Sequence, residues 1–185
     1  MIKIKVFILS VLLVIGGVYQ SEVQAGPSEF HAGELIPKYG KVARVNTTQV
    51  IPDEMQFKVA FDMSEQSTPG SLNRHLVKLA RFLNMHANTG VSVSRMNLAL
   101  VVHGKAVQDV TKQSFYTQNQ PGTTSANIDL VRTLIKHGVQ IYVCGQTAAY
   151  YDVEASDLVE GVEMALSAMT AHAILAADGF SLNPF

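Results

Sequence analysis

Residues 139–147 read Val-Gln-Ile-Tyr-Val-Cys-Gly-Gln-Thr. The apolar run ends at Cys144, the only cysteine of the chain, and Gly145 follows it. A short run rich in β-branched residues and bounded by a glycine predicts a buried strand over 139–144. The cysteine is then expected at the carboxyl end of that strand. Open α/β sheets hold their ligands at this edge, so the position predicts a functional thiol.

Comparable apolar runs predict three more strands, at 57–63, 98–102 and 162–168. A short edge strand is expected within 180–185. Patterns of helical period lie between these runs and predict helices over about 71–90, 106–114, 125–137 and 169–178. In the first of these helices, Ser71 is expected to be the cap, with an apolar face of Leu72, Leu76, Leu79 and Leu83. Strands that alternate with helices predict an α/β fold with a mostly parallel sheet and helices on both faces.

The first 25 residues have the order of a secretory signal. Lys3 and Lys5 precede an apolar run over 6–18, and Val23-Gln24-Ala25 offers small residues for cleavage. The run is shorter than the roughly 20 residues that cross a bilayer. We therefore expect residues 1–25 to be a cleaved signal peptide and the mature protein to be periplasmic, with no membrane association after cleavage.

Residues 26–56 are interrupted throughout by glycine and proline and predict an extended arm. The arm either packs over its own domain or reaches a neighbouring subunit. Residues 57–185 form the predicted α/β domain.

Charge and cysteine content exclude several classes of protein. Loss of residues 1–25 would reduce the 14 basic and 15 acidic side chains to 12 and 14, because Lys3, Lys5 and Glu22 leave. A chain that is nearly neutral has no electrostatic footprint for nucleic acid. One cysteine excludes a disulfide scaffold.

A second strand end carries chemistry, because His103-Gly104 closes the run at 98–102. If the two strands are neighbours, the imidazole of His103 and the thiol of Cys144 face one crevice. Backbone N–H groups at the start of a helical turn stabilise a thiolate and lower its pKa. We therefore predict Cys144 and His103 as catalytic residues, and a ligand-binding set of Gly104, Gly145, Gln146 and Thr147.

Plainer interpretations of these residues stay open. A free cysteine is often a small buried hydrophobe, and His103 could simply cap the strand end. Residues 116–124 are polar and predict a loop, either a lid or an ordinary surface connection. A phosphate loop is excluded, because position 99 is an alanine where the motif needs glycine. No His/Cys cluster has metal-ligand spacing, so neither a metal nor a cofactor is predicted.

Three segments resemble the DsrE/DsrF-like family over roughly residues 57–185. They are the strand that ends in Val101-Val102-His103-Gly104, the run Ile141-Tyr142-Val143-Cys144-Gly145-Gln146, and residues 162–169 with Gly179-Phe180. The resemblance implies a compact α/β fold that assembles as trimers or hexamers. Several cytoplasmic members of the family pass sulfur, as a cysteine persulfide, to a partner in sulfur oxidation or tRNA thiolation. Cys144 resembles the cysteine of the exported relatives.

Two functional hypotheses follow. In the first, the protein handles sulfane sulfur in the periplasm, holds it as a persulfide on Cys144, and exchanges it with a donor or acceptor protein or a small sulfur compound. It would then be a sulfur carrier or sulfurtransferase. In the second, it is a non-catalytic oligomeric module that binds a small ligand or a partner at the strand ends.

Overall fold

Five parallel strands form the centre of the structure, a computed structural model that describes residues 26–183. The predicted signal peptide lies outside these residues. Along the sheet the strand order is β4-β3-β2-β1-β5, and every neighbouring pair is parallel. The strands are β1 (Phe57–Met63), β2 (Met96–Val102), β3 (Gln140–Cys144), β4 (Val162–Ala165) and β5 (Ser181–Asn183).

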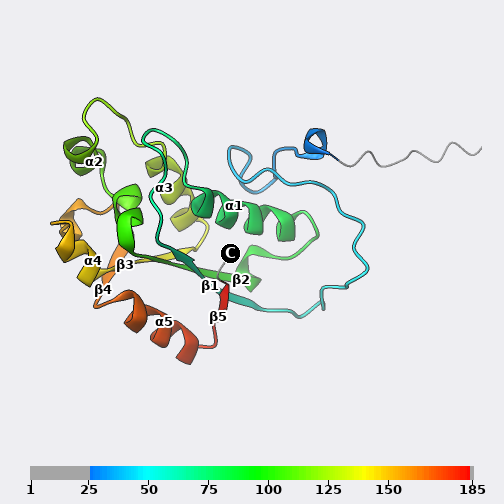
Figure 1. Cartoon of the computed structure of the whole chain (residues 1–185). Helices are drawn as coiled ribbons and strands as arrows, with labels where there is room; N and C mark the ends of the chain where they lie inside the picture. Colours follow the sequence, from blue (N-terminus) through cyan, green and yellow to red (C-terminus); the bar gives the residue numbers. More distant parts are fainter. Residues whose placement is uncertain (1–25, 184–185) are drawn as a thin grey trace, which may run out of the picture.

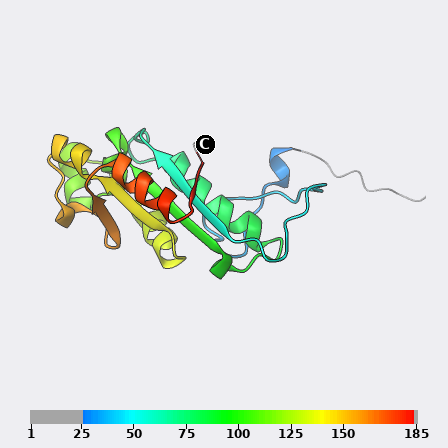
Figure 2. The ribbon, with the colours of Figure 1, turned by 90° about the horizontal axis from the view of Figure 1, so that it is seen from below.

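Helices cover both faces of this sheet, as predicted. They are α1 (Arg74–Ala87), α2 (Gln113–Asn119), α3 (Ile128–Lys136), α4 (Gly145–Tyr150) and α5 (Ala168–Ala177). Helices α1 and α3 lie together on one side, and α5 lies alone on the other (Figures 1 and 2). The α/β fold class predicted from the alternating pattern is confirmed.

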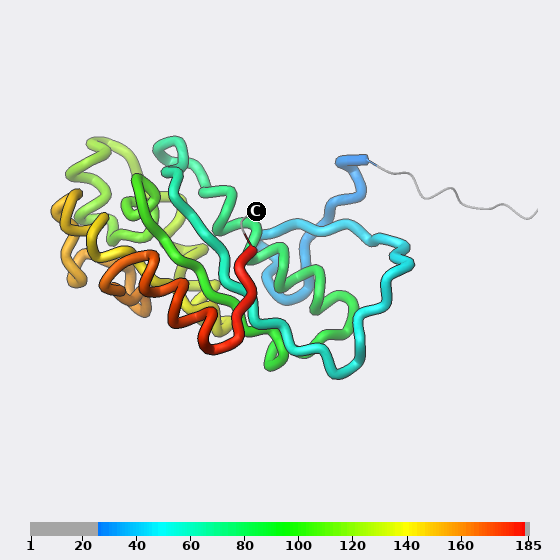
Figure 3. Tube along the Cα trace, turned by 60° about the horizontal axis from the view of Figure 1, so that its bottom comes forward, coloured from blue at the N-terminus to red at the C-terminus, as the bar shows by residue number. Residues whose placement is uncertain are grey.

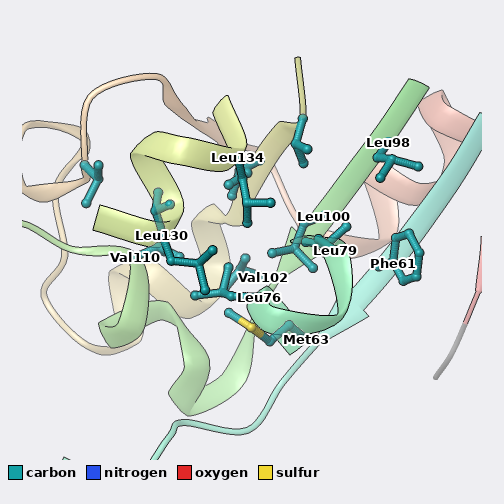
Figure 4. Close-up of a cluster of buried hydrophobic side chains, with 14 of the residues drawn as sticks. Phe61, Met63, Leu76, Leu79, Leu98, Leu100, Val102, Val110, Leu130 and Leu134 are labelled. Carbon is teal, nitrogen blue, oxygen red and sulfur yellow. The ribbon is translucent and has the colours of Figure 1, made fainter. Parts of the chain in front are cut away.

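The two faces of the sheet are buried to very different extents. Toward α1 and α3, Leu98, Leu100 and Val102 of β2 join a large apolar core with Leu76, Leu79, Leu130 and Leu134 (Figure 4). Toward α5 the buried cluster is small and consists of Ala60, Ala99, Val101, Ala171 and Leu175. Because side chains alternate along a strand, one strand supplies both clusters. The α5 face is therefore held by few and mostly small side chains.

The start of α1 differs from the prediction. Asn73, and not Ser71, is the cap: its side chain accepts a hydrogen bond from the N–H of His75. The turn that begins at Pro69-Gly70 continues through Ser71, whose N–H bonds to the carbonyl of Thr68. Leu72 precedes the helix and is exposed, so it is not part of the apolar face.

The segment after β2 also differs from the prediction. Instead of a helix over 106–114, a 3-10 helix η3 (Gly104–Val110) precedes α2. The predicted loop at 116–124 is partly helical, because α2 continues to Asn119. Tyr116 is almost fully buried, and its hydroxyl accepts from the N–H of Gly70. These contacts hold the first part of the segment against the turn before α1.

Strand β4 is shorter than the run predicted at 162–168. It ends at Ala165, and Ser167 caps α5 by accepting a hydrogen bond from the N–H of Thr170. The first helical residue is Ala168. A serine cap therefore ends an apolar pattern that by itself favours a strand.

The arm over residues 26–56 runs beside α1 (Figure 3). Ile36, Tyr39 and Val42 of the arm are buried. Buried Asn84 of α1 joins the arm to the domain, because its side chain bonds to the N–H of Ile36 and to three carbonyl groups, those of Ile36, Tyr39 and Gly40. In contrast, Val45 and Val50 are exposed. None of the helices within residues 26–183 has the length and apolar character needed to cross a membrane.

Candidate functional site: the thiol at the end of β3

Cys144 is the last residue of β3 and the N-cap of α4. Its neighbour Val143 points into the core beneath α1 and α3, whereas Tyr142 packs with the cluster on the α5 face. The alternation of a strand therefore places the thiol on the α5 side of the sheet. Only 6% of Cys144 is exposed. The sulfur thus lies just beneath the surface, at the carboxyl edge where the sequence predicts it.

Donor groups at the starts of two helices act on the sulfur. Burial by itself raises the pKa of Cys144, but the Thr147 hydroxyl and the backbone N–H groups of Thr147, Ala168 and Gln146 lower it, and the net pKa lies below its usual value. Gln146 and Thr147 belong to the first turn of α4, and Ala168 begins α5. Donors at helix starts stabilise a thiolate in this way. The site therefore favours an anionic sulfur.

Ala168 is the donor that the sequence did not predict, and Gly145 acts differently from the prediction. A Cβ on Gly145 would lie 2.6 Å from the carbonyl oxygen of Ala165 and 3.2 Å from that of Leu166. Only a glycine lets the segment after β4 pass this close. The absence of a side chain at 145 therefore allows the start of α5 to reach the sulfur.

His103 lies at the matching end of the neighbouring strand. Val102 of β2 is paired with Val143 of β3, so the next residues, His103 and Cys144, lie side by side at the edge of the sheet. Both follow the alternation onto the α5 face. The Nε2 atom of His103, however, lies 2.9 Å from Oδ2 of Asp62 on the opposite neighbour, β1. The structure thus brings imidazole and thiol to one edge, while the imidazole's hydrogen bond goes to a carboxylate.

Asp62 also binds a second histidine that the sequence analysis did not select. The Nε2 atom of His172 on α5 lies 2.8 Å from Oδ1 of Asp62. Burial raises the pKa of Asp62, but the hydrogen bonds from His172 and then from His103 lower it below its usual value. An acidic residue inside the apolar run 57–63 was the available signal. The partner on α5 is distant in sequence and gives no such signal.

Gly104 has a backbone role at the same edge. Its φ is +54°, and a Cβ there would lie 2.7 Å from the carbonyl oxygen of Ser64. Together with the bond from the N–H of His103 to the carbonyl of Met63, this close approach fixes where β2 ends. An open hollow nearby is lined by Ser64, Glu65, Gln66, Ser67, Thr68 and Lys105. Neither Gly104 nor Cys144 lines this hollow.

Within residues 26–183, no group of three or more His, Cys, Asp or Glu side chains is arranged to hold a metal ion. Asp62, His103 and His172 are instead joined by hydrogen bonds. The described residues thus place a thiol, two imidazoles and a carboxylate on the α5 side of the sheet.

A family profile and one solved structure with a TM-score above 0.5 agree with this fold. The sequence profile of the DsrE/DsrF-like family matches residues 55–184. The structure of a protein of unknown function, MTH1491 from Methanobacterium thermoautotrophicum, has 18% identity and a TM-score of 0.54, over 70% of this chain and all of that one. The ychN protein from E. coli has 17% identity and a TM-score of 0.49, over 71% of this chain and all of that one. A search of curated proteins found no match.

Proposed function

Because the chain belongs to the DsrE/DsrF-like family, we propose that it handles sulfane sulfur and carries it as a persulfide on Cys144. The observation that carries the proposal is the set of donors at the sulfur, from Gln146 and Thr147 of α4 and Ala168 of α5. These donors favour the thiolate, which is the nucleophilic form of cysteine. They are also suited to an anionic persulfide, because preorganised N–H groups stabilise negative charge wherever it rests nearby.

The proposed reaction conserves atoms and electrons. The thiolate of Cys144 attacks the outer sulfur of an anionic donor such as thiosulfate. A bond forms between the two sulfurs, and the sulfur–sulfur bond of thiosulfate breaks. Sulfite leaves with the electron pair, so no external oxidant or reductant is needed. His103 takes the thiol proton before the attack. Later, an acceptor thiolate attacks the outer sulfur of the persulfide, and Cys144 leaves as a thiolate.

The compartment belongs to the proposal as well. The basic and apolar pattern over residues 1–25 supports export to the periplasm, where the donor would be a small sulfur compound or another exported protein. A lone cysteine suits this setting, because it has no second thiol in its own chain with which to form a disulfide.

Self-association is proposed from the surface of α5. Met169 and Ile174 are 80% and 59% exposed on this helix, and Leu166 just before it is 72% exposed. Large apolar side chains that gather on an exposed face mark an interaction surface. We assign a second copy of the chain as the cover, in line with the trimers or hexamers that the family resemblance implies.

A binding module without chemistry is the second candidate, and the low exposure of Cys144 favours it. In that case a small ligand would bind at the edge of the sheet and the thiol would only pack. Cys144→Ser, which changes the side chain least, would then leave ligand binding and assembly unchanged.

Mass spectrometry after incubation with thiosulfate or polysulfide tests the proposal. We expect Cys144 to gain one sulfur atom that is removed by a reducing thiol, and Cys144→Ser to gain none. Failure to gain sulfur from any of several donors, by a protein that is folded and whose thiol reacts with an alkylating agent, would leave the binding module as the better account.

A further inference from the structure

Asp62 forms one hydrogen bond with each of two imidazoles through its two separate oxygens. His172 lies 2.8 Å from Oδ1 and His103 lies 2.9 Å from Oδ2. The three side chains are about one quarter to one third exposed, at 33%, 34% and 24% for Asp62, His103 and His172. They form a polar cluster on the α5 face of the sheet, where the neighbouring side chains are mostly alanines.

The cluster connects the two elements that lie on either side of the thiol. His103 ends β2, beside Cys144 on β3. His172 lies one turn after Ala168 on α5, and residues four apart share a helix face. Ala168 supplies a backbone N–H to the sulfur. A single carboxylate therefore holds both the imidazole beside the thiol and the helix whose first turn reaches it.

The ends of α5 are tied to the sheet by β4, whose Ala165 is paired with Cys144, and by β5, which pairs with β1, but few side chains hold the helix between them. Its buried apolar contacts come from Ala171 and Leu175, whereas the opposite face of the sheet carries the large core. Small side chains bury little area and make few contacts. The hydrogen bond from His172 to Asp62 is thus a polar contact that ties α5 to the sheet one turn after the start of the helix.

Asp62 also determines which ring nitrogen of His103 carries the proton. An ionised carboxylate only accepts hydrogen bonds, so each imidazole donates from Nε2. A neutral His103 then carries its free lone pair on Nδ1, for which the described residues provide no hydrogen-bond partner. The nitrogen that can take a proton is therefore the one that Asp62 does not occupy.

We propose that Asp62 is a positioning residue for Cys144: through His172 it keeps the Ala168 N–H at the sulfur, and through Nε2 of His103 it leaves Nδ1 as the base. The biological meaning of this role rests on the proposed persulfide function. The effect of Asp62 on the ionisation of the Cys144 thiol does not depend on that function.

The test is the pH dependence of the alkylation rate of Cys144, measured with iodoacetamide on the whole protein. Asp62→Asn keeps the size of the side chain but removes its charge and replaces one of the two accepting oxygens by a donating NH2 group. We expect the alkylation midpoint to move to higher pH, and the rate below the midpoint to fall on the order of threefold, as for one weakened hydrogen bond to the thiolate. His172→Leu should act in the same direction.

The sign of the shift separates positioning from simple charge effects. Removing a nearby negative charge, taken alone, lowers the pKa of a thiol, because the thiolate is repelled less. Glu163→Gln is the matched control: Glu163 is an exposed carboxylate on β4 with no hydrogen bond to an imidazole in the described structure. We expect this variant to match the wild type or to shift the midpoint to lower pH.

Unchanged or lowered midpoints in both Asp62→Asn and His172→Leu would overturn the proposal. Should Asp62→Asn fail to fold, His172→Leu and the more conservative His172→Gln address the same contact from α5. The His172→Gln variant should keep a midpoint closer to that of the wild type.

The alkylation result is independent of sulfur loading. If the midpoints shift but no donor loads Cys144, the persulfide function fails and the positioning role stands; if loading occurs with unshifted midpoints, the reverse holds.

Discussion

The backbone N–H of Ala168, the first residue of α5, helps to lower the pKa of Cys144, the last residue of β3. The first turn of α4 supplies the remaining donors. The pKa of Cys144 therefore involves groups from both α4 and α5.

Thr147 contributes its hydroxyl as well as its N–H to the sulfur. In Thr147→Ala the hydroxyl is lost, so the pKa of Cys144 should rise. Alkylation below the midpoint should slow by on the order of fivefold, as for one lost hydrogen bond. Thr147→Ser keeps the hydroxyl and should retain the wild-type midpoint. Thiolate absorbance measures the pH profile directly. If Thr147→Ala, Thr147→Ser and the wild type have the same profile, the hydroxyl does not act on the sulfur.

Gly145→Ala should destabilise the protein by about 1–3 kcal/mol, because the new methyl group meets the carbonyl oxygens of Ala165 and Leu166. It should also raise the pKa of Cys144, since α5 must move away. Gly90→Ala is the control: position 90 has φ +88° but nothing within 4 Å of the added carbon, so it should cost stability only. Urea unfolding and thiol titration measure the two effects. A thiol that titrates alike in all three proteins would contradict the account of Gly145.

Asp109 is fully buried and accepts hydrogen bonds from the N–H and hydroxyl of Ser67 and from the side chain of Asn73. Asp109→Ala leaves these donors unpaired and should cost about 3 kcal/mol of unfolding free energy. Asp109→Asn removes the charge but keeps an accepting oxygen, so it should be far milder. Equal losses for the two substitutions would mean that filling this space, and not hydrogen bonding, is what matters.

The pH dependence of Asp109 provides a separate test. Burial raises the pKa of Asp109, and its hydrogen bonds to Asn73 and Ser67 only partly oppose this. A carboxyl whose folded pKa is raised favours the folded state most at pH below its ordinary value of 3.8, and this contribution is lost as pH rises through the folded pKa. Relative to Asp109→Asn, the wild type should therefore become less stable with rising pH. A constant difference across that range, in urea unfolding, would contradict the assignment.

Self-association should depend on the apolar surface of α5. Ile174→Glu places a charge on the exposed side of the helix and should shift the protein toward smaller species in sedimentation equilibrium. Met85→Glu is a matched control, because Met85 is 43% exposed on α1, on the other face of the sheet. A wild type that sediments as a monomer, or equal behaviour of both variants, would refute a second copy as the cover of α5.

Much of the fold could be predicted because local patterns and tertiary packing agree. The run 57–63 and the run that ends at Cys144 are strands within a residue of the predicted bounds. The apolar pattern predicted the wrong element boundary where a polar side chain caps a helix. Asn73 replaces Ser71 as the cap because the turn runs longer, and Ser167 ends β4 early.

For the site, the residues at each strand end could be predicted, but the contacts that other elements make with them could not. Cys144, His103 and the first turn after the cysteine could be selected, because strand ends of a parallel sheet share an edge. Ala168 and His172 could not, since nothing in residues 162–178 signals which backbone N–H or imidazole will face β1 or β3. Asp62 was visible as a charge in an apolar run, but its two partners come from the tertiary fold.

The central claim is that Cys144 carries sulfane sulfur, and intact-mass analysis of protein taken directly from cells tests it most directly. Free thiols are blocked during lysis and no reductant is added. The account predicts that part of the protein carries one additional sulfur atom on Cys144, and that a reducing thiol removes it. Protein whose Cys144 is entirely unmodified in cells supplied with a sulfane donor would contradict it.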